Sequence, residues 1–126
     1  MGPERSQRIS PANSAANIGL PFSIHLDTPV VPMNPLFAVW SAVNRITSSG
    51  KLLGPSERVN VMQALRSVTI DAAWQMFLDK DTGSLEVGKK ADLVILSKNP
   101  ILEPMKLNKI DVLATYVAGL QIYTAK

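Results

Sequence analysis

The sequence contains no cysteine and a single histidine, His25, among its 126 residues. Without cysteine the chain can form no disulfide, offer no thiolate to a metal and use no thiol nucleophile. A hydrolytic zinc ion generally takes three protein ligands. The chain alone therefore cannot build a histidine-rich metal centre.

Long apolar runs are also missing. The longest clean run is Leu93–Leu96, which has the length of a strand, whereas a transmembrane helix needs about 20 apolar residues. The basic residues near the start are not followed by the apolar stretch of a signal peptide. We therefore expect a soluble protein without a membrane partner, and the cytoplasm is the favoured compartment.

Charge is sparse and only mildly positive. Thirteen Lys and Arg oppose ten Asp and Glu, which gives a net charge of +3, and charged residues make up 18% of the chain. The basic residues form no stripe and are not interleaved with aromatics, so nucleic acid is not expected as a partner. Hydrophobic residues make up 46%, which suits a folded domain with a core.

Local patterns predict a strand, three helices and then a small, mostly antiparallel sheet. Residues 21–27 alternate between apolar and polar side chains, which predicts a strand. Helices are expected over 35–46 with Asn34 as cap, after Gly54-Pro55 with Ser56 as cap, and from Thr69 to Phe77; one or two helical turns are expected around 11–18. Strands are expected at 84–87, 91–96, 112–117 and 120–124, the last two forming a hairpin. Four side chains have the spacing of core residues on these helices: Trp40, Met62, Trp74 and Met76.

The first half of this map is short of strands. One strand cannot satisfy its own backbone groups, so residues 21–27 either join the C-terminal sheet or belong to a larger structure. The hydrophobic pattern changes from helical to strand period near residue 79. We therefore expect two parts, residues 1–78 and 79–126.

His25 and Asp27 stand two residues apart on the predicted strand, which would place their side chains on the same side, roughly 6 to 7 Å apart. Both could face one metal ion or substrate, and catalytic residues of α/β barrels lie at the carboxyl ends of strands. The pattern is short. Asp27 could equally cap the turn that follows it, with His25 merely half-buried.

A phosphate-binding loop is suggested by Gly83 to Lys89, whose glycines and lysine fit the first part of that motif. Lys90, however, occupies the position that should supply a Ser or Thr hydroxyl, and a strand rather than a helix follows. We interpret the glycines as turn residues and both lysines as a solvated turn.

The segment from Gly83 to Leu96, GSLEVGKKADLVIL, closely resembles the C-terminal signature of the amidohydrolase superfamily. Upstream, LDTPV at 26–30, NPL at 34–36 and AVNR at 42–45 resemble the eighth strand and following helix of the amidohydrolase family 3 branch. The resemblance continues through Arg66, Thr69 and Ala73 to VAG at 117–119 and Tyr123, and so covers nearly the whole chain.

This resemblance implies an α/β fold that is part of a larger one. Residues 1–78 would form the last strand and outer helices of an incomplete TIM-type (β/α)8 barrel, and residues 79–126 the C-terminal strands of a small β-sandwich. The implied function is that of a C-terminal fragment of a metal-dependent hydrolase acting on amide-type C–N bonds of a small-molecule substrate. Exposed sheet edges are expected to promote homo-oligomerisation.

The resemblance also implies roles for the two site candidates. Asp27 corresponds to the residue that binds or approaches the metal and exchanges a proton with the attacking water. His25 occurs in some relatives and is expected to contact the substrate or to support the site. The intact enzyme is expected to use a divalent metal, with zinc favoured, whereas this chain alone is expected to bind none and to be inactive. The alternative is a non-catalytic binding or oligomerisation module derived from the barrel tail.

Overall fold

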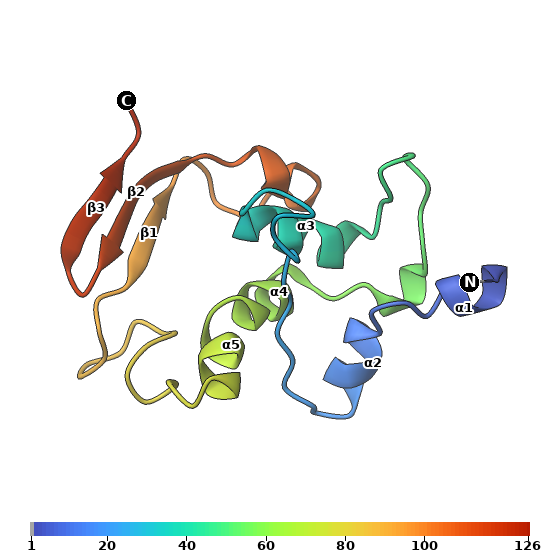
Figure 1. Cartoon of the computed structure of the whole chain (residues 1–126), viewed down its shortest axis with the longest axis horizontal. Coiled ribbons are helices and arrows are strands. Elements are labelled where there is room, and N and C mark those ends of the chain that lie inside the picture. The colour runs from blue at the N-terminus through green and yellow to red at the C-terminus, as the bar shows by residue number, and fades with distance from the viewer. Residues whose placement is uncertain (1) are drawn as a thin grey trace.

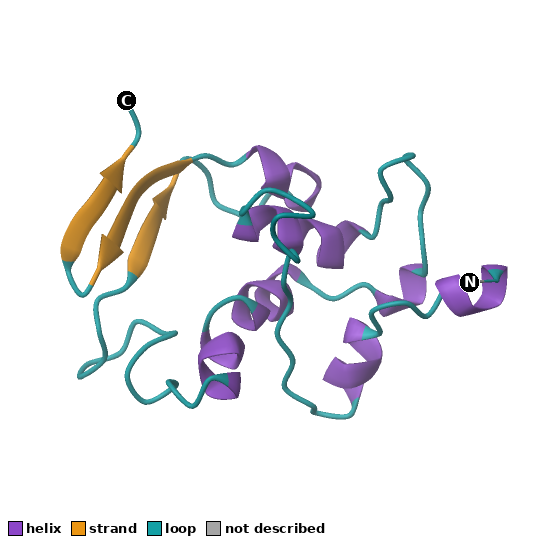
Figure 2. Ribbon diagram, viewed as in Figure 1, coloured by secondary structure: helices purple, strands orange, loops and turns teal. Residues whose placement is uncertain are grey.

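The computed structural model describes residues 2–126 and has a mixed α/β fold, with a three-stranded sheet at the C-terminal end of the molecule (Figure 1). The helices occupy the centre and the N-terminal end, away from the sheet (Figure 2). In chain order the elements are α1 (Pro3–Ser6), α2 (Ala12–Asn17), α3 (Pro35–Asn44), the 3-10 helix η1 (Pro55–Glu57), α4 (Val61–Ser67), α5 (Ile70–Gln75), β1 (Leu93–Leu96), the 3-10 helix η2 (Pro104–Lys109), β2 (Val112–Val117) and β3 (Leu120–Thr124).

The sheet has the order β1-β2-β3, and both pairs are antiparallel. Val117 pairs with Leu120 across a turn in which Ala118 and Gly119 both have positive φ, 49° and 80°. Two successive positive φ angles give the turn the twist that suits a two-residue hairpin. The predicted hairpin and the bounds of β2 and β3 are confirmed, while β1 begins two residues later than expected.

Helix α3 begins where its sequence predicts and ends at Asn44, two residues before the expected end. The Asn34 side chain accepts a hydrogen bond from the Phe37 N–H at 3.2 Å, and Pro35 takes the first helical position. Arg45 ends the helix in the left-handed region, at φ 53°.

The core lies between α3, α4 and η2. Its buried members are Val39, Val59, Val61, Ala64, Leu107 and Ile110. Two hydrogen bonds fasten η2 to α3: the Trp40 indole N–H donates to the Met105 carbonyl, and the Asn44 amide donates to the Pro104 carbonyl, both at 3.0 Å. The second half of the chain thus completes the core of the helical half.

Two helix predictions are wrong in detail. Instead of one helix capped by Ser56, the chain forms η1 and then α4, which is capped by Asn60. The intervening residues are not helical because Val59 is buried in the core and its N–H bonds to the Ala42 carbonyl at 3.4 Å. Helix α5 ends at Gln75, so Phe77 lies beyond it with φ 60° and a side chain that is 91% exposed.

Two strand predictions are wrong as well. Residues 21–26 are non-helical but belong to no strand, because they do not pair with the sheet β1-β2-β3. The Ile24 N–H bonds instead to the Ser67 carbonyl at 3.3 Å. Residues 84–87 form no strand either. There the Ser84 hydroxyl donates to the Glu86 carboxylate at 2.6 Å, a local bond that competes with strand pairing.

Three of the four side chains expected in the core are largely exposed: Met62 at 53%, Trp74 at 51% and Met76 at 68%. Ala73 is the buried residue of α5, so that helix packs through one narrow side and leaves its larger side chains outward. Within residues 2–126, no helix has both the length and the apolar character needed to cross a membrane.

Candidate functional site

His25 and Asp27 lie side by side at the end of the non-helical segment 21–26, and both are exposed. The Asp27 backbone N–H donates to Nδ1 of His25 at 3.1 Å. The Asp27 carbonyl accepts a hydrogen bond from the Val30 N–H at 2.8 Å, which closes a turn over residues 27–30. Asp27 itself has φ 53°, in the left-handed region that few L-residues other than Asn and Asp adopt readily.

Two cavities adjoin His25. One, of about 290 Å³, lies between the His25 segment and α3, and its lining includes Phe37, Ser41 and Arg45. The other, of about 380 Å³, lies between the same segment and α2 and includes Ala15 and Phe22. Asp27 does not line either cavity. His25 and Asp27 are therefore close in space, as their spacing predicts. Of the two, His25 lines these cavities.

Arg45 is the charged residue of the first cavity. Its guanidinium donates to the Leu53 carbonyl at 2.8 Å and to the Ser10 carbonyl at 3.0 Å. Burial lowers the pKa of Arg45, while the nearby Glu57 carboxylate opposes that shift. Because its N–H groups are held by backbone carbonyls, Arg45 fixes the wall of the cavity.

The metal ligands on this chain fall short of a complete site. Among residues 2–126 no three His, Cys, Asp or Glu side chains gather closely enough to hold a metal ion. A hydrolytic zinc needs about three protein ligands, and the Nδ1 atom of His25 is already engaged by the Asp27 N–H. Asp27 could supply one oxygen ligand, so the remaining ligands of any metal centre must come from outside these residues.

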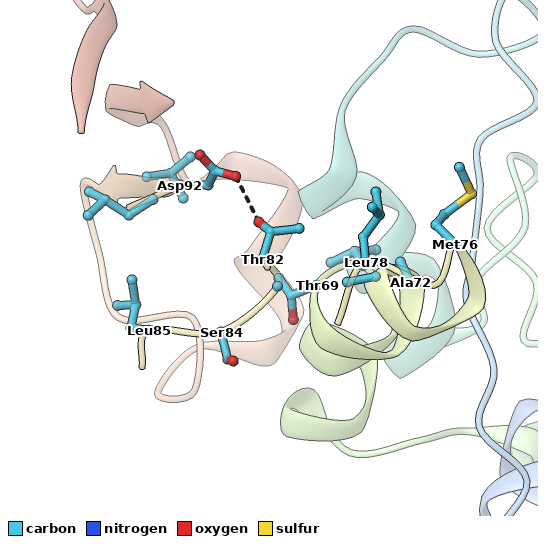
Figure 3. Close-up of a pocket in the computed structure, with 13 residues that line it drawn as sticks. Thr69, Ala72, Met76, Leu78, Thr82, Ser84, Leu85 and Asp92 are labelled. Carbon is cyan, nitrogen blue, oxygen red and sulfur yellow. Dashed lines mark hydrogen bonds between the residues drawn. The ribbon is translucent and has the colours of Figure 1, made fainter. Parts of the chain in front are cut away.

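A third cavity, of about 560 Å³, lies between α5 and the start of β1 (Figure 3). Apolar side chains form most of its wall, among them Ala72, Met76, Leu78 and Leu85. Figure 3 shows Thr82 between Asp92 and the residues Ala72 and Leu78, with its hydroxyl donating to the Asp92 carboxylate at 2.7 Å. Sequence reasoning missed this cavity, although the GSLEVGKKAD segment that lines part of it was recognised as a signature.

Asp92 joins two loops through its carboxylate. One carboxylate oxygen accepts from the Ala118 N–H in the β-hairpin turn at 2.7 Å, and the other accepts from Thr82. These two bonds, the Ala118 N–H first, lower the pKa of Asp92. The carboxylate therefore stays ionised and holds the hairpin against the 79–92 loop.

Lys89 is not part of a solvated turn, which corrects that expectation. Its side chain is 12% exposed, and its ammonium donates to the Ser84 hydroxyl at 2.6 Å and to the Glu86 carboxylate at 3.5 Å. The Ser84 hydroxyl, followed by Lys89, lowers the pKa of Glu86. Lys89 thus stabilises the turn through internal contacts.

Comparisons with known proteins identify the family of the chain. The profile of the amidohydrolase family matches residues 1–123. The chain is 34% identical to an N-substituted formamide deformylase of Arthrobacter pascens over 117 residues, and 47% identical to Protein LONG AFTER FAR-RED 3 of Arabidopsis thaliana over 98 residues. These matches cover 92% and 77% of this chain but only 22% and 17% of the two relatives.

Solved structures give the same result for the fold. An amidohydrolase from Thermotoga maritima superposes with a TM-score of 0.67 at 21% identity, covering 90% of this chain and 26% of that one. A protein described as a prolidase from Bifidobacterium longum superposes with a TM-score of 0.62 at 28% identity, covering 89% and 25%. The profile match over nearly its whole length establishes that the chain belongs to the amidohydrolase family.

Proposed function

We propose that this chain is the C-terminal part of a metal-dependent hydrolase that cleaves amide-type C–N bonds in small molecules. The observation that carries the proposal is Asp27, an exposed carboxylate held in a turn at the end of the segment 21–26. The name of one relative specifies N-substituted formamides, and hydrolysis of a formamide to an amine breaks a C–N bond.

The role proposed for Asp27 is that of general base and then general acid. Its carboxylate takes a proton from the attacking water and returns it to the leaving nitrogen, which would otherwise depart as a poor leaving group. A divalent metal, with zinc favoured, would acidify that water when bound. His25, beside Asp27, belongs to the same site as a residue that contacts the substrate or supports the carboxylate.

The proposal also places the chain in a larger fold. Residues 1–78 would complete a (β/α)8 barrel, with the non-helical segment 21–26 in the place of its last strand, and residues 79–126 would complete a β-sandwich. Support comes from the segment 21–26, which pairs with no strand, and from the large exposed side chains at the end of α5, Trp74, Met76 and Phe77, which suit elements whose neighbours lie elsewhere in a longer chain. With one histidine and no cysteine, these 126 residues alone would be inactive.

The test begins with the coding DNA upstream of Met1, where we expect an open frame that encodes a strand-like segment with His-x-His. The longer protein, loaded with zinc, should hydrolyse N-substituted formamides, and Asp27→Asn should lower kcat by about 10² to 10⁴, the range for losing a general acid–base group. Asn suits the left-handed φ of Asp27 and so preserves the fold.

The inactivity of the fragment has its own test. Hydrolysis of the same amides by the 126-residue chain with zinc, lost in Asp27→Asn, would refute it.

Association is the second candidate function, and the sheet favours it. Strands β1 and β3 are both open edges, and β3 exposes Leu120 at 70%, Ile122 at 61% and Tyr123 at 49%. Open apolar edges promote pairing with another chain. A module of this kind should sediment as a defined oligomer and melt cooperatively at a temperature that zinc does not change.

A further inference from the structure

The bond between His25 and Asp27 has the arrangement of a local turn. A side-chain acceptor at one residue receives the backbone N–H two residues on, at 3.1 Å, as Asn and Asp side chains do in Asx turns. Here the acceptor is Nδ1 of an imidazole. A neutral imidazole that accepts through Nδ1 carries its proton on Nε2.

This bond stabilises a backbone conformation of Asp27 that L-residues disfavour. Asp27 has φ 53°, so its conformation needs local support. His25 takes up the N–H of Asp27, and the Val30 N–H bonds to its carbonyl. Both backbone groups are therefore engaged, while the Asp27 carboxylate makes no hydrogen bond or ion pair with residues 2–126.

We propose that His25 is a positioning residue for Asp27. Through Nδ1 it holds the Asp27 backbone in the left-handed turn, and this keeps the carboxylate exposed to the attacking water. This inference rests on the proposed function of Asp27. Of the two roles open to His25, contact with the substrate and support of the carboxylate, it assigns the second. With Nδ1 accepting and Nε2 protonated, neither nitrogen has a free lone pair, so His25 is not a metal ligand in this geometry.

Two amide variants separate support of Asp27 from direct contact with a substrate. In His25→Asn the side-chain oxygen lies near the position of Nδ1 and can accept the Asp27 N–H as an ordinary Asx turn. In His25→Gln the amide reaches the position of Nε2, which faces away from that N–H. A supporting role is rescued by Asn, whereas a role in direct contact through Nε2 is rescued by Gln.

The experiment is NMR on the ¹⁵N-labelled 126-residue chain at neutral pH, without metal or substrate. The imidazole nitrogen shifts of the wild type should identify the tautomer protonated on Nε2. Exchange of the Asp27 amide with water should quicken about tenfold in His25→Gln, as expected for the loss of one hydrogen bond, and stay within about twofold of the wild type in His25→Asn. The buried Ala64 amide, bonded to the Asn60 carbonyl, reports whether each variant remains folded.

An imidazole protonated on Nδ1, or equal exchange of the Asp27 amide in all three proteins, would overturn the proposal. If a variant unfolds, the tautomer of the wild type still decides, because that measurement needs no substitution. The readout involves neither metal nor turnover. If Asp27→Asn left the activity of the longer enzyme unchanged, the proposed function would be refuted, but the proposal about this hydrogen bond would not.

Discussion

Glu57 accepts hydrogen bonds from both the backbone N–H and the hydroxyl of Ser14, at 2.9 and 2.6 Å, although 43 residues separate them. Glu57 is 5% exposed. Neighbouring bonds strengthen the same junction: Asn13 donates to the Ser56 carbonyl, and Arg45 donates to the Ser10 carbonyl. The N-terminal segment is therefore fastened to η1 and to the end of α3, beside the cavities next to His25.

The Glu57 junction should weaken in acid. The Ser14 hydroxyl first, and then its N–H, lower the pKa of Glu57 below its ordinary value of 4.5. Since the folded-state pKa lies below that of the unfolded chain, the ion stabilises the fold above about pH 4.5, and this contribution is lost as pH falls through the lowered pKa. Thermal melting from pH 7 to pH 3 should therefore show a smaller acid loss in Glu57→Gln than in the wild type.

Glu4→Gln is the matched control, because it removes an exposed carboxylate from α1 in the same N-terminal segment. Its melting temperature should follow the wild-type pH dependence. The wild type keeps part of its acid sensitivity in either case, since Asp92 and Glu86 also have lowered pKa values. Identical pH curves for wild type and Glu57→Gln would show that the junction does not stabilise the fold.

Asn60, rather than Ser56, should carry the capping energy of α4. The Asn60 side chain accepts from the Gln63 N–H at 2.9 Å, and the Gln63 side chain accepts from the Asn60 N–H at 3.0 Å. Loss of such a cap costs about 1 kcal/mol, so Asn60→Ala should lower the free energy of unfolding in urea by about that amount. Ser56→Ala should stay within about 0.5 kcal/mol of the wild type. Equal losses would contradict the assignment of the cap.

The cap of α4 illustrates what the sequence could and could not predict. Where one start signal occurs alone, as with Asn34 and Pro35, it predicts the start of α3 correctly. Before α4, two start signals compete within six residues, and burial of Val59 decides between them. The hairpin was predictable because its turn and register are local, whereas the strand expected at 21–27 depended on a partner that residues 2–126 do not provide.

The candidate site was likewise predictable only in part. The short spacing of His25 and Asp27 predicted that they lie together, because two residues of extended chain cannot separate them far. The positive φ of Asp27 and the bond from its N–H to His25 have no signal in residue spacing. The cavity beside Asp92 depends on α5 folding against a loop ten to twenty residues later, a contact that periodicity does not encode.

Gly83 should tolerate a side chain far less well than Gly88. Both have φ above 90°, at 92° and 94°, so alanine at either position costs about 1 to 2 kcal/mol of backbone strain. A Cβ at Gly83 would also lie 2.7 Å from the Cβ of Ala73, whereas a Cβ at Gly88 meets nothing within 4 Å. Overpacking adds about 1 to 3 kcal/mol. Urea denaturation should therefore find Gly83→Ala the less stable variant by about that difference, and equal stabilities would contradict the close contact of this loop with α5.

Leu107 should control the stability of both halves of the chain. It lies in η2, after residue 79, yet its side chain is fully buried in the core with Val39 and Ala64. Leu107→Ala should lower the free energy of unfolding by about 2 to 5 kcal/mol, and the exposed Leu102→Ala, a matched substitution at 76% exposure, by less than about 0.5 kcal/mol. Because η2 completes the packing of α3 and α4, the helical circular dichroism signal should melt together with the near-ultraviolet signal of the whole chain. If residues 1–78 folded independently of 79–126, Leu107→Ala would leave the helical transition unchanged, and the two parts would be separate folding units.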